Sequence, residues 1–318
     1  MPAPPAVPAP AASLEHDERL SMETRVSILC PFRNAAAFLP GLIASVRAQS
    51  HADWELLLID DGSADLGARQ AAVAAERDGR IRALRAPPRP AGSRGGPWWP
   101  RNHGLAHTTA PWVAFLDADD LWHPRKLERQ LAWHAASGAA LSVTGYGRFV
   151  DGDGPRLTDW RLPPARFDYA TLRRVNVIPM LTLLLRRELL AEGFQPCPHE
   201  DYLRWLDLFR RQSGLRGHTV PELLAFYRLH GANLTAARWS MPLWTYRVYR
   251  CHGASRVGAA TALVPWGLAQ VGAAWRSRRQ PLRPSLAEAI AADPPLPLPP
   301  SAGGAPIESL DQVNGPWA

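Results

Sequence analysis

The sequence predicts an α/β protein built on a mostly parallel, doubly wound sheet flanked by helices. From residue 25 onward, short apolar runs typical of buried strands alternate with stretches that have apolar residues at helical spacing. Two of the apolar runs, 54–59 and 112–116, end directly on carboxylates. Open α/β folds bind ligands at the carboxyl ends of their strands, so the same pattern predicts a site at that edge of the sheet.

The first half of the predicted domain alternates strands with helices. We predict strands at 25–30, 54–59 and 81–84, and helices at 35–49 and 66–77. Pro31 is expected to end the first strand. A loop rich in Pro, Gly and Arg follows at 85–100, and loops of this length are usually functional or disordered.

The second half of the domain is less regular. We predict helices at 101–108, 124–137 and 202–212, strands at 112–116, 141–150, 215–220 and 224–228, and a strand-like run at 177–185. Between 151 and 173 the pattern is too weak to assign. The segment 236–279 is predicted to be helical, with tryptophans as anchors.

Composition divides the chain into one domain and three flanking segments. We expect a disordered Pro/Ala-rich tail at 1–23, the α/β domain at 24–235, a helical extension at 236–280 and a Pro-rich tail at 281–318. Within the last tail, 293–306 is the part whose composition predicts disorder. The start lacks the apolar run of a signal peptide, so the cytoplasm is the expected compartment.

The net charge of +7 comes almost wholly from arginine, since Lys126 is the single lysine. Nucleic-acid binding would fit the charge, but the sequence has no recognition motif for it, so no nucleic-acid partner is expected. Residues 257–275 are moderately apolar and are followed by three arginines. They suit a helix lying on the domain, or peripherally on the inner face of a membrane, better than a span.

The three cysteines, Cys30, Cys197 and Cys251, are odd in number and far apart. Their spacing is not that of metal ligands. We therefore expect reduced thiols, two of them buried.

The most informative segment is the acidic end of the strand at 112–116, with carboxylates at Asp117, Asp119 and Asp120. Carboxylates gathered at one strand end repel one another, which suggests that a cation neutralises them. Mg²⁺ and Mn²⁺ prefer such oxygen ligands and complete their shells with substrate phosphates. The first interpretation is a metal–diphosphate site; the alternative is a helix-capping Asp beside two solvated acids.

Six segments in order carry a resemblance to a known family. They are 31–34 (Pro-Phe-Arg-Asn), 58–65 (Leu-Ile-Asp-Asp-Gly-Ser-Ala-Asp), 101–105 (Arg-Asn-His-Gly-Leu), 115–120 (Phe-Leu-Asp-Ala-Asp-Asp), 199–206 (His-Glu-Asp-Tyr, then Trp-Leu) and 227–230 (Tyr-Arg-Leu-His, then Asn233 and Thr235). Together they resemble the family 2 glycosyltransferases with a GT-A fold, over about 25–235. The resemblance implies an inverting, divalent-metal-dependent transfer from a nucleotide-sugar, a UDP-sugar in first place, to a glycan or lipid-linked acceptor.

The resemblance also implies roles for individual residues. Asp119 is the main carboxylate for Mg²⁺ or Mn²⁺, Asp117 contacts ribose or metal-bound water, and His230 approaches the diphosphate or the metal. The residues that it places at the nucleotide-sugar are Pro31, Arg33, Asn34, Asp60, Asp61, Arg101, Asn102, Asp117 and Arg228. For Asp60 and Asp61 the alternative is turn chemistry, and for Arg101 a solvated surface side chain.

Asp201 matches the family's general base, and Glu200 would support the acceptor or share the proton. A helix N-terminus favours an ionised carboxylate at this position. The alternative role of Asp201 is to cap the helix at 202–212. Two residues depart from the family pattern: Arg33 replaces a common tyrosine, and Asp207 replaces a common arginine. We expect the second change to alter a local ion pair or an acceptor contact.

Two other functions remain open from the sequence. Sugar nucleotidyltransferases also bind nucleotides and Mg²⁺, but they carry a Gly-rich loop with Arg and Lys after the first strand, where this chain has residues 31–34. A non-catalytic nucleotide-sugar-binding module predicts erosion at Asp119 or Asp201, and both carboxylates are present.

Overall fold

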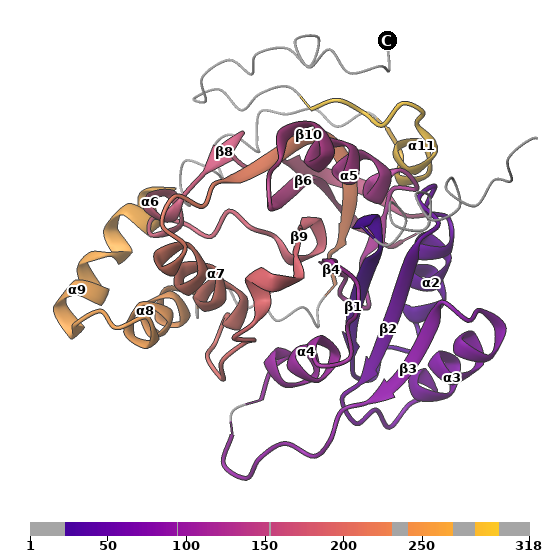
Figure 1. Cartoon of the computed structure of the whole chain (residues 1–318), viewed down its shortest axis with the longest axis horizontal. Helices are drawn as coiled ribbons and strands as arrows, with labels where there is room; N and C mark the ends of the chain where they lie inside the picture. Colours follow the sequence, from indigo (N-terminus) through magenta and orange to yellow (C-terminus); the bar gives the residue numbers. More distant parts are fainter. Residues whose placement is uncertain (1–22, 94, 153, 231–240, 270–283, 299–318) are drawn as a thin grey trace, which may run out of the picture.

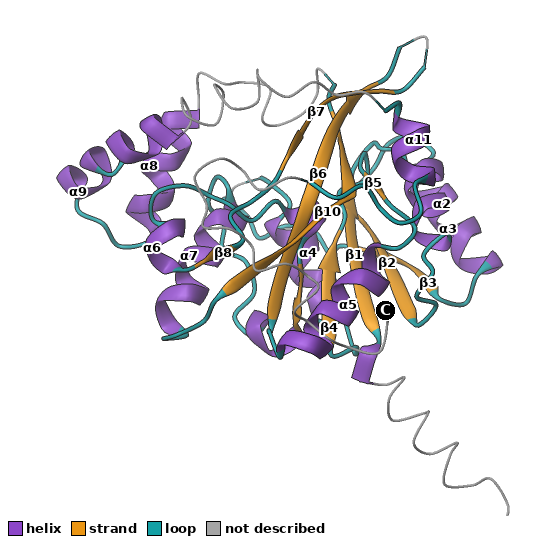
Figure 2. Cartoon of the chain, turned by 90° about the horizontal axis from the view of Figure 1, so that it is seen from above, coloured by secondary structure: helices purple, strands orange, loops and turns teal. Residues whose placement is uncertain are grey.

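The structure is a computed structural model that describes residues 23–93, 95–152, 154–230, 241–269 and 284–298. These residues form one mixed sheet with strand order β3-β2-β1-β4-β9-β6-β10-β5, to which β7 and β8 add at the side (Figure 2). Helices cover both faces, as the sequence predicts. Asn233, Thr235, residues 1–22 of the first tail and residues 270–280 lie outside the described part of the chain.

The first half of the sheet is parallel and holds the acidic strand end. Its strands are β1 (Val26–Phe32), β2 (Trp54–Asp60), β3 (Ile81–Arg85) and β4 (Trp112–Phe115). β1 and β2 are buried along their whole length, which explains their continuous apolar sequences. Alternate β1 residues face opposite cores: Ile28 packs with one cluster and Leu29 with the other.

Three helices cover one face of this half and two cover the other. On the side of Ile28 lie α2 (Leu39–Arg47), α3 (Gly67–Arg77) and α5 (Lys126–Ser137). On the side of Leu29 lie α4 (Trp98–Leu105) and α7 (Glu200–Arg211). The helix predicted at 101–108 is α4, which begins three residues earlier. Pro97 and Pro100 suit its first turn, because the backbone N–H groups there have no partner within the helix.

β1 continues through Pro31 to Phe32, so the expectation that Pro31 ends the strand is wrong. Residues 29 and 31 direct their backbone groups toward β4, because Leu116 N donates to Leu29 O and direction alternates along a strand. The β1–β4 register stops at Leu29. The missing N–H of Pro31 therefore costs no hydrogen bond in the sheet.

The second half of the sheet mixes parallel and antiparallel pairs. β6 (Leu141–Val150) runs parallel to β10 (Gly217–Arg228), and the antiparallel strands are β5 (Leu121–Trp122), β7 (Arg156–Arg161), β8 (Arg166–Phe167) and β9 (Leu184–Arg186). The other elements here are α6 (Tyr169–Leu172), α8 (Met241–Cys251), α9 (Arg256–Thr261) and the short 3₁₀ turns Met180–Thr182 and Arg187–Leu190. Within the described residues, no helix is both long and apolar enough to cross a bilayer.

Two predictions in this half are wrong in detail. The strand-like run at 177–185 forms a 3₁₀ turn and only the start of β9, since the turn at Met180–Thr182 follows Pro179. The strands predicted at 215–220 and 224–228 are one strand, β10, with shifts of register between Val220 and Ala225. Pro221, which has no N–H, sits inside that irregular stretch and produced the apparent break.

Part of the expected C-terminal tail is folded onto the domain. α11 (Leu286–Ala291) begins with a capping box made by Ser285 and Glu288. Leu286 and Leu298 join a buried cluster with Phe226 of β10. The disorder predicted from residue 293 is therefore wrong as far as 298, because leucines among the prolines supply apolar area that the composition average hides.

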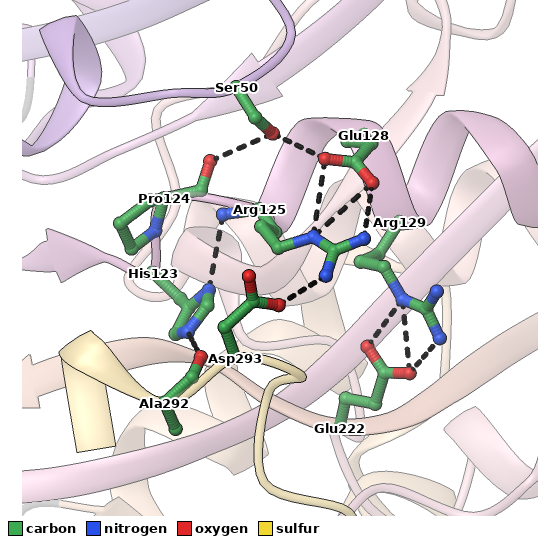
Figure 3. A network of polar contacts seen from close by, with 9 residues as sticks. All are labelled: Ser50, His123, Pro124, Arg125, Glu128, Arg129, Glu222, Ala292 and Asp293. Carbon is green, nitrogen blue, oxygen red and sulfur yellow. Dashed lines mark hydrogen bonds and ion pairs between the residues drawn. The ribbon is translucent and has the colours of Figure 1, made fainter. Parts of the chain in front are cut away.

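Polar contacts join the same segment to the residues just before α5, as Figure 3 shows, and to β10. Arg125 forms an ion pair with Asp293, and a ring nitrogen of His123 lies 3.0 Å from Ala292 O. Leu298 N donates to Pro221 O at 2.8 Å. The C-terminal segment 284–298, called the strap below, is thus held against β10 and against the residues just before α5.

Deletion of residues 284–318 is expected to destabilise the protein. It removes two buried leucines from the cluster around Phe226, each worth about 1.5–3 kcal/mol, so the free energy of unfolding should fall by about 3–6 kcal/mol. Urea unfolding measures the loss. Deletion of 299–318 is the matched control, and equal stability of the two truncated proteins would contradict a structural role for the strap.

Candidate active site

The loops after β1 and β2 are tied together at the carboxyl edge of the sheet. Asn34 N donates to Ser63 Oγ at 3.0 Å, and Ala64 N donates to Asn34 Oδ1 at 2.8 Å. Asn34 adopts a positive φ of 51°, which lets one residue serve both bonds. Arg33 beside it is exposed, whereas Pro31 is buried in the strand.

Asp60 and Asp61 occupy the end of β2, but their carboxylates have different partners. Asp60 is buried and accepts from Ser63 N at 2.8 Å, which is turn chemistry of the kind considered as the alternative. Asp61 forms an ion pair with Arg89 from the loop before α4. The structure thus shows both residues ordering the pocket edge, and their contact with a nucleotide stays a prediction.

Arg101 joins three elements at the centre of the edge. Its guanidinium donates to Asp117 at 2.9 Å, after β4, and forms an ion pair with Glu200, at the start of α7. The side chain is only 4% exposed, so the surface alternative is wrong. Burial opposes the charge on Arg101, but Asp117, Glu200 and Asp201 outweigh it and raise the pKa of the guanidinium.

A glycine lets α4 bring Arg101 to this position. A Cβ built on Gly104 would lie 2.8 Å from Leu29 and 2.9 Å from Ile59, so only glycine allows the helix to lie this close to β1 and β2. Asn102 points elsewhere. Its side chain exchanges two hydrogen bonds with the backbone of Phe194, at 2.8 and 2.7 Å, and so fixes the loop that leads toward α7.

The acidic strand end gathers residues from two distant segments. A ring nitrogen of His230, beyond β10, lies 2.7 Å from Asp119 Oδ2, so the predicted pair is brought together. Burial and the neighbouring Asp117 raise the pKa of Asp119. Asp120 is fully buried, burial raises its pKa well above the ordinary value, and its Oδ1 accepts from Arg228 N at 3.0 Å. The capping alternative is wrong, because Arg125 precedes α5 and makes no side-chain cap.

Arg228 holds the turn that carries these carboxylates. Its Nε donates to Asp119 O at 2.8 Å, and its guanidinium forms an ion pair with Asp151. The same group lies 4.6 Å from the ring centre of Phe149. In this structure Arg228 therefore positions the site, and its expected contact with the nucleotide stays a prediction.

The donor set fits a hard divalent ion on its chemistry. Asp117 raises the cost of ionising Asp119, and a cation would relieve that cost. Among the described residues, no three His, Cys, Asp or Glu side chains lie close enough to hold a metal by themselves. That arrangement suits Mg²⁺ or Mn²⁺, which proteins often hold through one or two carboxylates while phosphates and water fill the shell.

The predicted base lies at the start of α7, beside Arg101. His199 takes the N-cap position with a φ of 52°, so α7 begins at Glu200 and Asp201 is not its cap. Asp201 is half-buried, and its Oδ2 accepts from Asn176 Nδ2 at 3.5 Å. Asn176 was missed from the sequence, since it follows the unassigned stretch and no periodic pattern marks it.

Glu200 differs from Asp201 in burial. It is 8% exposed, and burial raises its pKa to about 7 despite the adjacent Arg101. The Glu200 carboxyl therefore binds its proton more tightly in the folded protein than in the unfolded chain. The stability contributed by this group is therefore complete below its ordinary pKa of 4.5 and is lost as pH rises to about 7.

We expect this linkage to be measurable by comparing the wild type with Glu200→Gln. Between about pH 5 and pH 8, the free energy of unfolding of the wild type should fall by roughly 1–3 kcal/mol relative to the variant. Urea titrations at several pH values provide the test. Parallel pH dependences of the two proteins would show that Glu200 titrates as it does in water.

Two hollows in the described part of the chain lie away from the carboxylate cluster of Asp117, Asp119 and Asp120. One, of about 460 Å³, is lined by residues of the β6–β7 hairpin (151, 152 and 154–156). The other, of about 350 Å³, lies beside α4 and is lined by Asn102 and Glu192 among others. The chemistry of the cluster, rather than the volume of a cavity, therefore identifies the candidate site.

Comparison with known proteins gives a consistent result. The sequence model of Glycosyl transferase family 2 matches residues 27–194. The chain is 31% identical, over 71% of its length and 87% of the relative, to the putative teichuronic acid biosynthesis glycosyltransferase TuaG of Bacillus subtilis. It is 32% identical, over 67% of its length and 81% of the relative, to the UDP-Glc:alpha-D-GlcNAc-diphosphoundecaprenol beta-1,3-glucosyltransferase WfgD of Escherichia coli.

Solved structures share the fold. TarS (residues 1–349) of S. aureus in complex with UDP-GlcNAc has a TM-score of 0.57 at 17% identity, covering 76% of this chain and 71% of that chain. The mannosyltransferase PcManGT of Pyrobaculum calidifontis, in complex with GDP-Man and Mn²⁺, has a TM-score of 0.54 at 16% identity and covers 81% and 76%. At these identities the likeness is one of fold.

Proposed function

The chain belongs to glycosyl transferase family 2, and we propose that it is an inverting, divalent-metal-dependent transferase that moves a sugar from a nucleoside-diphosphate sugar to a glycan or lipid-linked hydroxyl. The observation that carries the proposal is the position of Arg101 between Asp117 and Glu200. The Arg101 guanidinium thereby links the end of β4, which is expected to face the diphosphate, with the start of α7, which is expected to face the acceptor. The nucleotidyltransferase alternative falls with the family assignment, and the presence of both Asp119 and Asp201 speaks against the non-catalytic one.

We propose distinct tasks for the residues of this edge. Asp201 accepts the proton of the attacking hydroxyl, and Asn176 helps to orient the Asp201 carboxylate for this step. Glu200 keeps Arg101 beside Asp201 and shares protons with the base. Arg101 offsets negative charge that grows on the leaving diphosphate. Asp119, with Asp117 or His230 as a second ligand, would hold Mg²⁺ or Mn²⁺, and the ion would supply further charge stabilisation for that leaving group.

The donor is proposed to be a UDP-sugar. The name of WfgD specifies UDP-Glc, and TarS was solved with UDP-GlcNAc. Pro31, Arg33, Asn34, Asp60 and Asp61 then form the edge that receives the base and ribose. An arginine in place of the family's tyrosine can still stack on a base through its planar guanidinium.

A donor panel tests this function. Hydrolysis and transfer are measured with UDP-, GDP- and TDP-sugars in the presence of Mn²⁺, and NMR determines the anomeric configuration of the product. We expect turnover with a UDP-sugar and an inverted anomer. Absence of turnover with every donor, or a retained anomer, would overturn the proposal.

We further propose that residues 24–235 are the transferase domain and that 236–280 form an extension which touches the cytoplasmic face of a membrane. The described part of the extension, α8 and α9, lies at the end of the molecule away from α3 (Figure 1). It carries most of the exposed large hydrophobic side chains of the described chain: Leu243, Val257, Val264 and Leu268. Exposed arginines flank them, and WfgD acts on a diphosphoundecaprenol substrate by its name.

Membrane contact predicts salt-sensitive binding to anionic vesicles. Exposed charges are screened over about 8–10 Å at ordinary ionic strength, so flotation should weaken as salt is raised. Val257→Ser with Val264→Ser should reduce flotation at low salt, whereas Leu66→Ser, an equally exposed leucine near α3, should not. No flotation of the wild type at low salt would refute the contact.

A further inference from the structure

Two cysteines far apart in the sequence meet where the extension packs on the domain. Cys197 lies in the loop before α7, and Cys251 is the last residue of α8. Their Sγ atoms are 3.0 Å apart, and both are thiols. Cys251 is exposed and Cys197 is 4% exposed, so one sulfur of the pair can be reached from solvent. The expectation of thiols, two of them buried, is confirmed, and the contact between Cys197 and Cys251 is a feature that the sequence did not indicate.

A single carboxylate fixes both sides of this contact. Asp207 Oδ1 lies 2.7 Å from His252 Nδ1, directly after Cys251, and Oδ2 accepts from Gln195 Nε2 at 3.4 Å, two residues before Cys197. The other ring nitrogen of His252 lies 2.7 Å from the Tyr169 hydroxyl. The same carboxylate therefore contacts the side chain of a residue near each cysteine, and it links the two segments that carry the sulfurs.

Asp207 is also one of the two positions at which this chain departs from the pattern of the family it resembles, where an arginine is common. In this chain Asp207 pairs with His252, the residue directly after α8, and the expected change of a local ion pair relative to the family stays a prediction. An arginine would leave the histidine and the glutamine without their shared acceptor.

We propose that Cys197 and Cys251 form a redox modification site, a reversible disulfide that closes by exchange with a low-molecular-weight disulfide such as oxidised glutathione. The Cys251 thiolate attacks the small disulfide and releases one small thiol. The Cys197 thiolate then attacks Cys251 Sγ and releases the second. Two protein thiols lose two protons and two electrons, and one small disulfide becomes two small thiols.

The bond would clamp the extension to the loop that leads into the base. α8 already contacts that loop through Trp244, whose ring centre is 5.1 Å from that of His199. A second contact joins Tyr249 to Tyr202 of α7, with hydroxyls 3.2 Å apart. A covalent link at the end of α8 keeps these contacts from opening. Amide exchange in α8 should therefore slow several-fold in the oxidised protein.

The test treats the full-length protein with oxidised glutathione and measures its mass and thiol content. We expect a loss of two hydrogens from the mass, a fall from three thiols to one, a linked peptide pair containing Cys197 and Cys251, and reversal by dithiothreitol. Persistence of three thiols would overturn the proposal. So would a wild-type protein that stops at a glutathione adduct on Cys251.

Three variants separate the pair from other causes. Cys251→Ser, a change at an exposed site, should abolish the linked peptides. Cys30→Ser is the matched control, because Cys30 is buried in another cluster, and it should crosslink like the wild type. Asp207→Ala should accumulate the glutathione adduct, since it removes the carboxylate that links His252 and Gln195 and so loosens the two segments that carry the sulfurs. Crosslinking of Asp207→Ala at the wild-type rate would contradict the alignment role of Asp207. None of these readouts depends on transferase activity.

Discussion

Replacement of Asp201 by asparagine is expected to lower turnover by about 10²–10⁴-fold, the usual share of general base catalysis. The amide retains the size of the carboxylate and can still accept from Asn176. It cannot take the acceptor proton. Because His199, not Asp201, occupies the N-cap of α7, the substitution removes no side-chain cap and should leave thermal stability nearly unchanged.

The measurement separates the base from a structural role. Donor affinity, determined by calorimetry, should match that of the wild type while the rate of transfer falls. Glu192→Gln is a matched control, because Glu192 is an exposed acid that pairs with Arg211, the last residue of α7. Turnover of Asp201→Asn near the wild-type value would remove Asp201 from the mechanism.

Replacement of Asp119 by alanine is expected to abolish divalent-dependent donor binding. The carboxylate is the partner of His230 and the expected main ligand of Mg²⁺ or Mn²⁺. The fold should survive, because Arg228 bonds the backbone oxygen of Asp119 and its own N–H bonds Asp120. Loss of a charge-assisted contact of about 1.5–3 kcal/mol would already weaken binding by roughly ten- to a hundredfold.

Calorimetry with a UDP-sugar, with and without Mn²⁺, distinguishes the outcomes. The wild type should bind more tightly with the ion, and Asp119→Ala should show no such difference. Asp151→Ala serves as the control, since it removes an exposed carboxylate that pairs with Arg228 from outside the cluster. An equal effect of Mn²⁺ on the wild type and on Asp119→Ala would place the ion elsewhere.

Local patterns explain why so much of the fold can be predicted from the sequence. The strands predicted at 54–59 and 112–116 are recognisable as continuous apolar runs, because a strand that is buried on both faces requires such a run. Proline produced two of the errors. At Pro31 and Pro221 a strand continues where the sequence suggests an end. Pro31 directs its nitrogen to a side on which β1 has no paired strand at this position, and Pro221 lies within a bulge of β10, so neither missing N–H costs a hydrogen bond.

The sequence by itself determined the α/β class, the acidic strand end, the candidate base and the order of the six motifs, because each depends on residues close together along the chain. Only the tertiary structure decided which distant groups share a contact. It brought Arg101 between Asp117 and Glu200, His230 to Asp119, and Cys251 to Cys197. Such contacts depend on how helices pack across a sheet, and chain spacing carries no information about that packing.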